Sequence, residues 1–166
     1  GKESEQSFSK IYLVDLSTSL LNVAKKKVKK LKLNNVECVE KDVCDFHSEP
    51  LDLVTFSYSL TMVPQWFQAI DKAYQQLKPG GLIGVVDFYV AQKHPFKGMQ
   101  PHTSWTRNFW PLWFSWDNVR LNPDHLPYLL NKFEKIELFE GHSRVPYAPF
   151  GSVPFYLFVG RKPLNH

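Results

Sequence analysis

Acidic side chains stand at or near the ends of three apolar segments in the first half of the chain. "IYLVD" ends at Asp15, "NNVECVEKD" ends at Asp42, and "LIGVVDF" carries Asp87. In an open parallel sheet, ligands bind beyond the carboxyl ends of the strands, where a carboxylate can accept hydrogen bonds from both hydroxyls of a ribose. We therefore predict that Asp15 accepts from a ribose. Asp42, 27 residues later, would accept from the exocyclic amine of adenine, with the Val43 N–H meeting a ring nitrogen.

Each acid also has a simpler interpretation. Asp15 alone could be an acid at a helix start, where the helix dipole favours negative charge, and Asp42 alone could be a loop acid. The recurrence of acids at successive strand ends favours the functional interpretation. The hydroxyl-rich stretch "FSYS" at residues 56–59 is a further candidate at the end of its strand.

The elements that must position these side chains alternate between strand and helix. Ser17 or Thr18 can cap a first helix, and Pro79 with Gly80 and Gly81 predicts the end of a second. Alternation at short spacing favours right-handed crossovers and a parallel sheet. The predicted strands span residues 11–14, 51–60 and 82–88, and residues 34–42 form a turn and a further strand that ends at Asp42. The second helix spans residues 66–81.

The second half of the chain departs from this alternation. Residues 91–130 contain no clear strand and are rich in Trp, Phe, His and Pro. Residues 133–143 and 153–162 predict two closing strands, antiparallel because the connection between them is short.

Composition indicates one globular domain, with 166 residues of which 43% are hydrophobic and 22% are charged. Much of the net charge of +4 lies in "KKKVKKLK" at residues 25–32. This pattern is typical of the solvated face of a helix, with an anionic membrane surface as the alternative, and no nucleic-acid motif accompanies it. Cys38 and Cys44 lack metal or redox spacing, which predicts free thiols in a reducing compartment. No apolar run is as long as a membrane span, and no signal peptide is visible.

The stretches "VDLS", "EKDV", "FSYSL" and "LKPGG" resemble the Rossmann-like methyltransferases that use S-adenosylmethionine. The later stretches "FWPLWFSWDNVRLNPDHLPYL" and "RVPYAPFGSVPFYLFVGRKP" are similar to the methyltransferase portion of betaine lipid synthases. Those enzymes trimethylate the homoserine amine of diacylglycerylhomoserine.

The resemblance implies an α/β, Rossmann-like methyltransferase sheet with an aromatic helical lid insertion and antiparallel closing strands. It also implies seven strands, of which the first and the glycine-rich loop after it have no counterpart here. We interpret the chain as a fragment or a truncated gene product in preference to a pseudo-enzyme, and expect it to bind S-adenosylmethionine weakly or not at all by itself. We expect a single domain over residues 1–166, with a cofactor-binding half (1–90), a lid (91–131) and closing strands (132–166).

The resemblance assigns roles to particular residues. Tyr58 and His125 are the candidates for a general base, although an orienting or structural role suits each of them as well. The chemistry needs no metal ion, and the sequence offers no metal cluster. The predicted cofactor-binding residues are Asp15, Leu16, Asp42, Val43 and Ser57.

The methyl acceptor would be bound in the second half of the chain. Aromatic rings can cage a quaternary ammonium, and ordinary packing in a lid or core suits them equally. A substrate carboxylate would need a cation, for which Arg144 is our choice, with Arg107 and Arg120 as alternatives. The predicted substrate-binding residues are Trp105, Trp110, Trp113, Tyr128 and Arg144, with Trp116 as a further ring.

These expectations extend to partners and location. We expect a lipid substrate at a membrane surface, no nucleic acid, and a fused or partner domain that makes diacylglycerylhomoserine. The location would be cytoplasmic and peripheral to an internal membrane such as the endoplasmic reticulum. The alternatives are a methyltransferase for a small soluble molecule and a non-catalytic Rossmann-like binding fragment.

Overall fold

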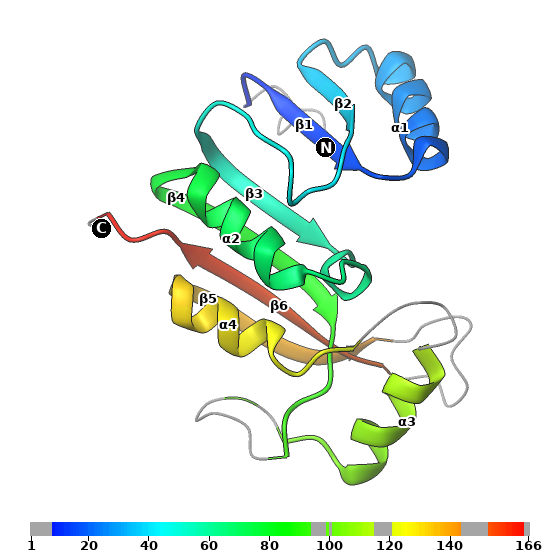
Figure 1. Ribbon diagram of the computed structural model, residues 1–166, viewed down its shortest axis with the longest axis vertical. Helices are drawn as coiled ribbons and strands as arrows, with labels where there is room; N and C mark the ends of the chain where they lie inside the picture. Colours follow the sequence, from blue (N-terminus) through cyan, green and yellow to red (C-terminus); the bar gives the residue numbers. More distant parts are fainter. Residues whose placement is uncertain (1–7, 94–98, 100, 115–120, 144–152, 165–166) are drawn as a thin grey trace. The chain divides into compact units, whose positions relative to one another are not determined.

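The computed structural model describes residues 8–93, 99, 101–114, 121–143 and 153–164, except for the side chains of Trp113 and Phe114 (Figure 1). The chain divides into two compact units, residues 1–47 and residues 48–166. The predicted division at residues 90 and 131 stays a prediction.

The first unit is a strand–helix–strand unit. Strand β1 (Ile11–Asp15) and strand β2 (Val36–Glu40) pair in parallel, with Asp15 opposite Glu40. Helix α1 (Thr18–Leu31) connects them and is capped by Ser17, whose side chain accepts a hydrogen bond from the Leu20 N–H at 3.3 Å. The parallel pair and its helix confirm the crossover predicted for this part of the sequence.

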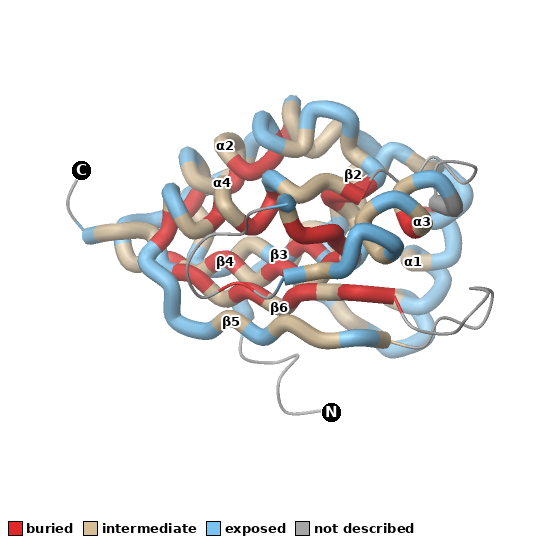
Figure 2. The backbone as a smooth tube through the Cα atoms, turned by 90° about the horizontal axis from the view of Figure 1, so that it is seen from below, coloured by how far each residue is buried: buried red, intermediate tan, exposed pale blue. Residues whose placement is uncertain are grey.

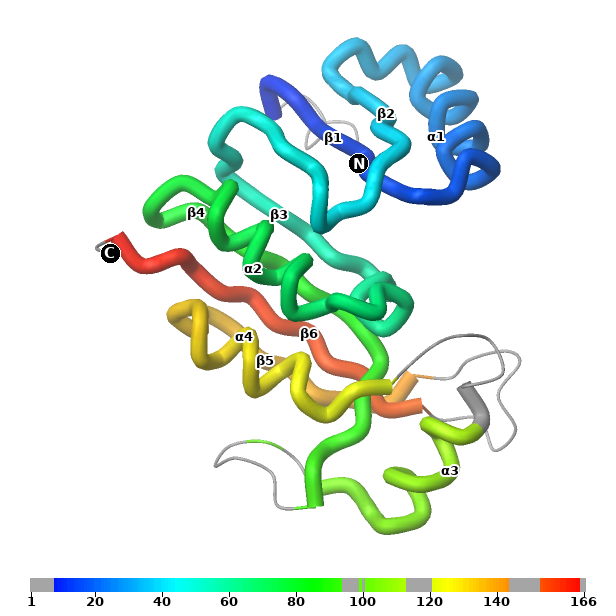
Figure 3. Tube along the Cα trace, in the orientation of Figure 1, coloured from blue at the N-terminus to red at the C-terminus, as the bar shows by residue number. Residues whose placement is uncertain are grey.

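The second unit contains a four-stranded mixed sheet in the order β3-β4-β6-β5 (Figure 3). Strands β3 (Leu51–Ser57) and β4 (Leu77–Phe88) are parallel, and β6 (Val153–Arg161) is antiparallel to both β4 and β5 (Glu134–Ser143). The predicted α/β fold and the antiparallel closing strands are confirmed.

Two helices form a layer over this sheet (Figure 2). Helix α2 (Trp66–Gln76) buries Ala69, Ile70 and Ala73, and helix α4 (His125–Lys132) buries Leu126 and Leu129. Along β4, alternate residues from Ile83 to Asp87 are buried, as expected for side chains that share one face of a strand. The core of the unit lies between this face and the two helices.

Some predicted boundaries differ from the structure. The helix predicted over residues 66–81 ends at Gln76, because the following residues join β4. Gly80 donates to the Lys162 carbonyl at 3.0 Å, and Lys162 donates to the Gly81 carbonyl at 2.8 Å. Gly80 has a φ of 79°, which glycine adopts without strain. Pairing with the far end of the chain therefore overrides the helix pattern.

Within residues 91–131, helix α3 (Ser104–Phe114) and helix α4 both form. The predicted strand over residues 51–60 ends at Ser57, and a short 3-10 helix, η1 (Leu60–Met62), follows it. Over the described part of the chain, every helix is too short or too polar to cross a membrane.

Candidate functional site

Asp15 is the last residue of β1, and its carboxylate is held in a fixed orientation. Its Oδ1 accepts a hydrogen bond from the Ser17 N–H at 2.7 Å, so the turn that starts α1 also holds the acid. The side chain is half-buried. Its other oxygen makes no hydrogen bond to any residue that the structure describes. This leaves an oriented acceptor at the carboxyl end of a parallel strand.

Asp42 repeats this arrangement after β2. Its Oδ1 accepts from the Cys44 N–H at 2.8 Å, and the residue is half-buried. The Lys41 N–H donates to the Asp15 carbonyl at 3.1 Å, which continues the pairing of the two strands up to both acids. Asp15 and Asp42 therefore lie at the same end of the strand pair.

The residues of the first unit fit an adenosine group. Ribose and adenine present hydroxyl and amine donors, which need acceptors, and Asp15 and Asp42 each have an oxygen without a partner among the described residues. Leu16 is 67% exposed and Val43 is half-buried. The contacts of all four residues with a cofactor stay predictions.

In the second unit, Ser57 and Tyr58 follow the buried part of β3. Ser57 is exposed. Tyr58 has a φ of 50°, a left-handed conformation that is strained for any residue with a side chain. Its N–H donates to the Val86 carbonyl at 2.8 Å, and its ring lies 4.8 Å from the Phe88 ring. These contacts hold Tyr58, which is 43% exposed, at the carboxyl ends of β3 and β4.

Asp87, on β4, has a different environment from Asp15 and Asp42. It is fully buried and accepts hydrogen bonds from the Thr61 hydroxyl at 2.9 Å, the Thr61 N–H at 3.2 Å and the Phe88 N–H at 2.8 Å. Burial raises the pKa of Asp87, and these hydrogen bonds oppose the rise. The carboxyl thus ties η1 to β4 and fixes the turn that carries Tyr58.

No motif in the sequence indicates a role for Thr61. It lies 26 residues from Asp87, and only the folded sheet brings them together. The signal available in the sequence is a hydroxyl residue just after a hydroxyl-rich strand end.

His125, a candidate base, is the first residue of α4 and is fully buried. Its ring lies 4.7 Å from the Trp66 ring, and neither ring nitrogen has a hydrogen-bond partner among the described residues. Burial lowers the pKa of His125 to about 4. A general base must reach the proton that it removes, so the position of His125 favours packing over catalysis.

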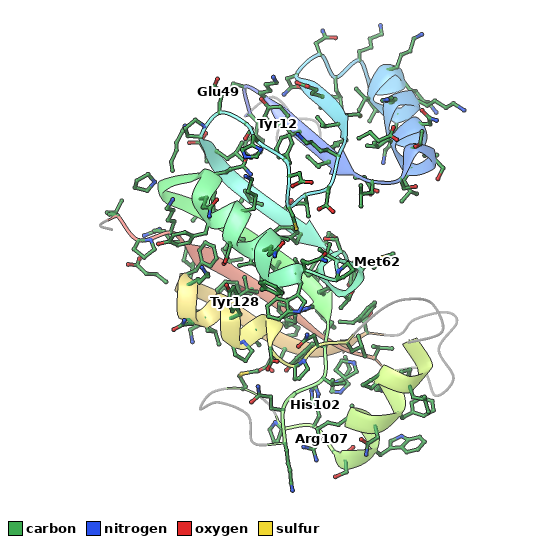
Figure 4. All side chains as sticks on the ribbon, in the orientation of Figure 1. Tyr12, Glu49, Met62, His102, Arg107 and Tyr128 are labelled. Atoms are coloured by element: carbon green, nitrogen blue, oxygen red, sulfur yellow. The ribbon has the colours of Figure 1, made fainter. Side chains whose placement is uncertain are left out.

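Tyr128, predicted to contact the substrate, joins α4 to α2 (Figure 4). Its hydroxyl donates to Asp71 Oδ1 at 2.6 Å, and Lys132 Nζ lies 2.6 Å from the same oxygen. The Tyr128 ring is 5.4 Å from the Trp66 ring. These contacts give Tyr128 a structural role, and its contact with a substrate stays a prediction.

The aromatic residues of α3 separate into buried and exposed rings. Trp110 is 5% exposed and packs with Val90, Leu121 and Val153. Trp105 is 64% exposed and stacks on Phe109 at 4.6 Å between ring centroids. The predicted contacts of Trp113, Trp116, Arg120 and Arg144 lie outside the described side chains.

Arg107 lies on α3 near His102 (Figure 4). Its Nη2 donates to the Ser104 hydroxyl at 3.1 Å, and its Nε is buried without a partner among the described residues. Burial, and then the charges of His142 and Arg107, lower the pKa of His102. Among the side chains that the structure describes, no three His, Cys, Asp or Glu residues are grouped to hold a metal ion.

Parallel strands with acids at their carboxyl ends, a mixed sheet and a helical layer define the class of Rossmann-like α/β folds. Residues 2–85, just over half of the chain, match the family described as "Methyltransferase domain". The chain belongs to this methyltransferase family.

A demethylmenaquinone methyltransferase from Listeria welshimeri is 34% identical over 76 residues, which is 45% of this chain. The match spans 32%, about a third, of that relative's length. Among solved structures, a Bacillus halodurans C-125 protein assigned to the methyltransferases has a TM-score of 0.72 at 19% identity, covering 93% of this chain and 83% of that one. The N-methyltransferase NodS from Bradyrhizobium japonicum WM9, in complex with S-adenosyl-L-homocysteine, has a TM-score of 0.68 at 14% identity. That alignment covers 96% of this chain and 71% of NodS.

These comparisons confirm the Rossmann-like methyltransferase fold and S-adenosylmethionine as the cofactor that this family uses. They do not single out the betaine lipid synthases. The family match also ends at residue 85, before the aromatic segment that we assigned to the methyl acceptor.

Proposed function

We propose that this protein transfers methyl groups from S-adenosylmethionine to the amine of a lipid headgroup. The observation that carries the methyltransferase part is the pair of carboxylates at the ends of β1 and β2. Each is fixed through one oxygen and has no partner for the other among the described residues. This arrangement, within a chain of the methyltransferase family, suits an adenosine group.

Each side chain has a defined task in this proposal. The Asp15 carboxylate accepts from the ribose hydroxyls and the Asp42 carboxylate from the adenine amine. When bound, S-adenosylmethionine supplies a methyl group on a positively charged sulfur. Tyr58, held in a strained conformation at the ends of β3 and β4, helps to orient the acceptor amine.

The protein contributes position and exclusion of water more than bond chemistry. Methyl transfer is an in-line displacement: the amine nitrogen uses its lone pair to form the new bond, and the sulfur keeps the electrons of the broken one. The nitrogen must therefore be neutral when it reacts and must lie in line with the methyl group. Its proton leaves to solvent or to a base.

The second half of the chain supports a lipid amine as the acceptor. The resemblance to betaine lipid synthases falls on residues 109–129 and 144–163, outside the family match. Trp105, four residues before the first of these stretches, presents an exposed ring stacked on Phe109, a surface that can face a cationic, methylated nitrogen. The homoserine amine of diacylglycerylhomoserine is the acceptor that we propose.

A second candidate acceptor is a quinone-type small molecule. It is favoured by one observation, the 34% identity to a demethylmenaquinone methyltransferase. That identity covers 45% of this chain, which limits what it says about the acceptor.

The two acceptors are distinguished by a direct assay. The full-length protein is incubated with methyl-labelled S-adenosylmethionine and either diacylglycerylhomoserine or demethylmenaquinone, and the products are identified by mass spectrometry. We expect mono-, di- and trimethylated diacylglycerylhomoserine and no labelled menaquinone. Labelled menaquinone alone would overturn the lipid acceptor, and binding of S-adenosylhomocysteine with no transfer to either molecule would overturn both.

A further inference from the structure

Helix α1 carries an uncompensated positive charge. Residues 16–36 contain six lysines and no acidic residue. All six lysines are exposed, and their side chains form no ion pair with any residue in the described ranges. In contrast, Lys10 pairs with Glu37 at 2.9 Å, and Lys78 pairs with Asp52 at 2.7 Å.

The same helix exposes large apolar side chains. Leu20 is 60% exposed, Val23 is 64% exposed and Leu31 is 49% exposed. Leu20, Val23, Lys27 and Lys30 follow one another at intervals of three and four residues, so they share one face of the helix. Leu21, the buried residue of α1, is on another side. Figure 2 shows most of α1 coloured as exposed.

We propose that this face, formed by Leu20, Val23, Lys27, Lys30 and Leu31, docks on the surface of an anionic lipid bilayer. The lysines complement the negative charge of the headgroups, and the apolar side chains enter the boundary between headgroups and acyl chains. A nucleic acid would satisfy the lysines but would offer no apolar environment to Leu20 and Val23. The combination of charge and exposed apolar area therefore selects the bilayer.

The expected size of the effect follows from the charges. Each lysine near an anionic membrane strengthens binding about fivefold, and salt weakens this contribution. The apolar side chains add a contribution that salt does not screen. Vesicle binding should therefore weaken as the salt concentration rises. The binding that remains at high salt should depend on Leu20 and Val23.

This docking face does not include Asp15 or Asp42, and the proposal does not depend on which acceptor is methylated. It predicts binding to lipid vesicles in the absence of S-adenosylmethionine and of any methyl acceptor. A failure of methyl transfer would leave that binding intact.

The test is vesicle co-sedimentation of the full 166-residue chain. One set of vesicles contains phosphatidylcholine only, and the other contains phosphatidylcholine with a substantial fraction of phosphatidylglycerol. The variant K27Q/K30Q is compared with K78Q/K135Q, which removes the same charge from exposed lysines of the second unit. A third variant, L20S/V23S, removes apolar side chains and keeps the charge. Circular dichroism checks that each variant retains its helices.

We expect the wild-type chain to bind the anionic vesicles and to bind phosphatidylcholine much more weakly. K27Q/K30Q should bind about 25-fold more weakly than the wild type, whereas K78Q/K135Q stays within about twofold. L20S/V23S should lose the residual binding at high salt. Equal losses for the two lysine pairs, no binding by the wild-type chain, or binding to an RNA oligonucleotide without binding to vesicles would overturn the proposal.

Discussion

Asp15 and Asp87 both lie near the carboxyl end of a parallel strand, yet their surroundings differ. In the first unit, Asp15 is half-buried and accepts a hydrogen bond from one backbone N–H, and its other oxygen has no partner among the described residues. In the second unit, Asp87 is fully buried and accepts three hydrogen bonds from its own chain. An acid at a strand end can therefore bind a ligand or stabilise the fold. An acid that is buried and whose oxygens already accept hydrogen bonds from the chain stabilises the fold.

The tryptophans of α3 extend this comparison and should give the largest effect. Trp110→Ala removes a buried ring from its contacts with Val90, Leu121 and Val153. We expect it to lower the free energy of unfolding by about 3–5 kcal/mol, measured by urea denaturation. Trp105→Ala, at an exposed ring on the same helix, is the matched variant and should change that free energy by less than about 0.5 kcal/mol. Equal losses of stability would show that Trp105 is also a packing residue.

Asp87→Ala tests the fold role of the buried acid. It leaves the Thr61 hydroxyl, the Thr61 N–H and the Phe88 N–H without their acceptor. We expect unfolding to become easier by about 2–4 kcal/mol, because buried donors without partners are costly. Asp87→Asn keeps one carbonyl oxygen as an acceptor and should cost less. If the free energy of unfolding of Asp87→Ala equals that of the wild type within experimental error, Asp87 does not stabilise the fold.

His125 is a second buried polar residue of the second unit, and its effect depends on pH. Its pKa in the folded state, about 4, lies below the ordinary 6.5, so the unfolded state takes up a proton first as pH falls. The stability that comes from keeping His125 neutral is fully present above pH 6.5 and is lost as pH falls toward 4, because the unfolded state alone binds a proton in this range. The free energy of unfolding should therefore fall by about 2 kcal/mol between pH 7 and pH 5.

The variant His125→Leu separates the pH dependence of stability that comes from His125 from the pH dependence that comes from the carboxyl groups. The variant should remove the pH-dependent difference, and it should be more stable at pH 7 because it lacks two buried nitrogens that have no hydrogen-bond partner among the described residues. Stability measured at several pH values checks both points. Parallel pH profiles for the variant and the wild type would contradict the account.

Much of the fold could be predicted from the sequence because the apolar segments are short and separated by turn residues. Strand β1 was predicted to within one residue, and the antiparallel pair β5 and β6 was expected from its short connection. The end of α2 was missed because Gly80 and Gly81 pair with Lys162, more than 80 residues away. Local patterns carry no information about such a pairing.

The candidate site could be predicted only for residues whose position depends on the end of a single strand. Asp15 and Asp42 are at strand ends by sequence alone. The partner of Asp87, Thr61, and the buried position of His125 depend on how α2 and α4 pack on the sheet. Sequence motifs identified Asp87 and His125 but not whether each side chain faces a ligand or the core.

The central claim is that the carboxylates of the first unit bind the cofactor and that Asp87 stabilises the fold. Calorimetric titration of S-adenosylhomocysteine into the full-length protein tests it with Asp15→Ala and a matched control, Asp45→Ala, at an exposed acid of the same unit. We predict that Asp15→Ala weakens binding about 10- to 100-fold, since it removes a charge-assisted hydrogen bond, with little change in the free energy of unfolding. Asp45→Ala should bind like the wild type. Unchanged affinity in Asp15→Ala, or a loss that merely follows a loss of stability, would contradict the claim.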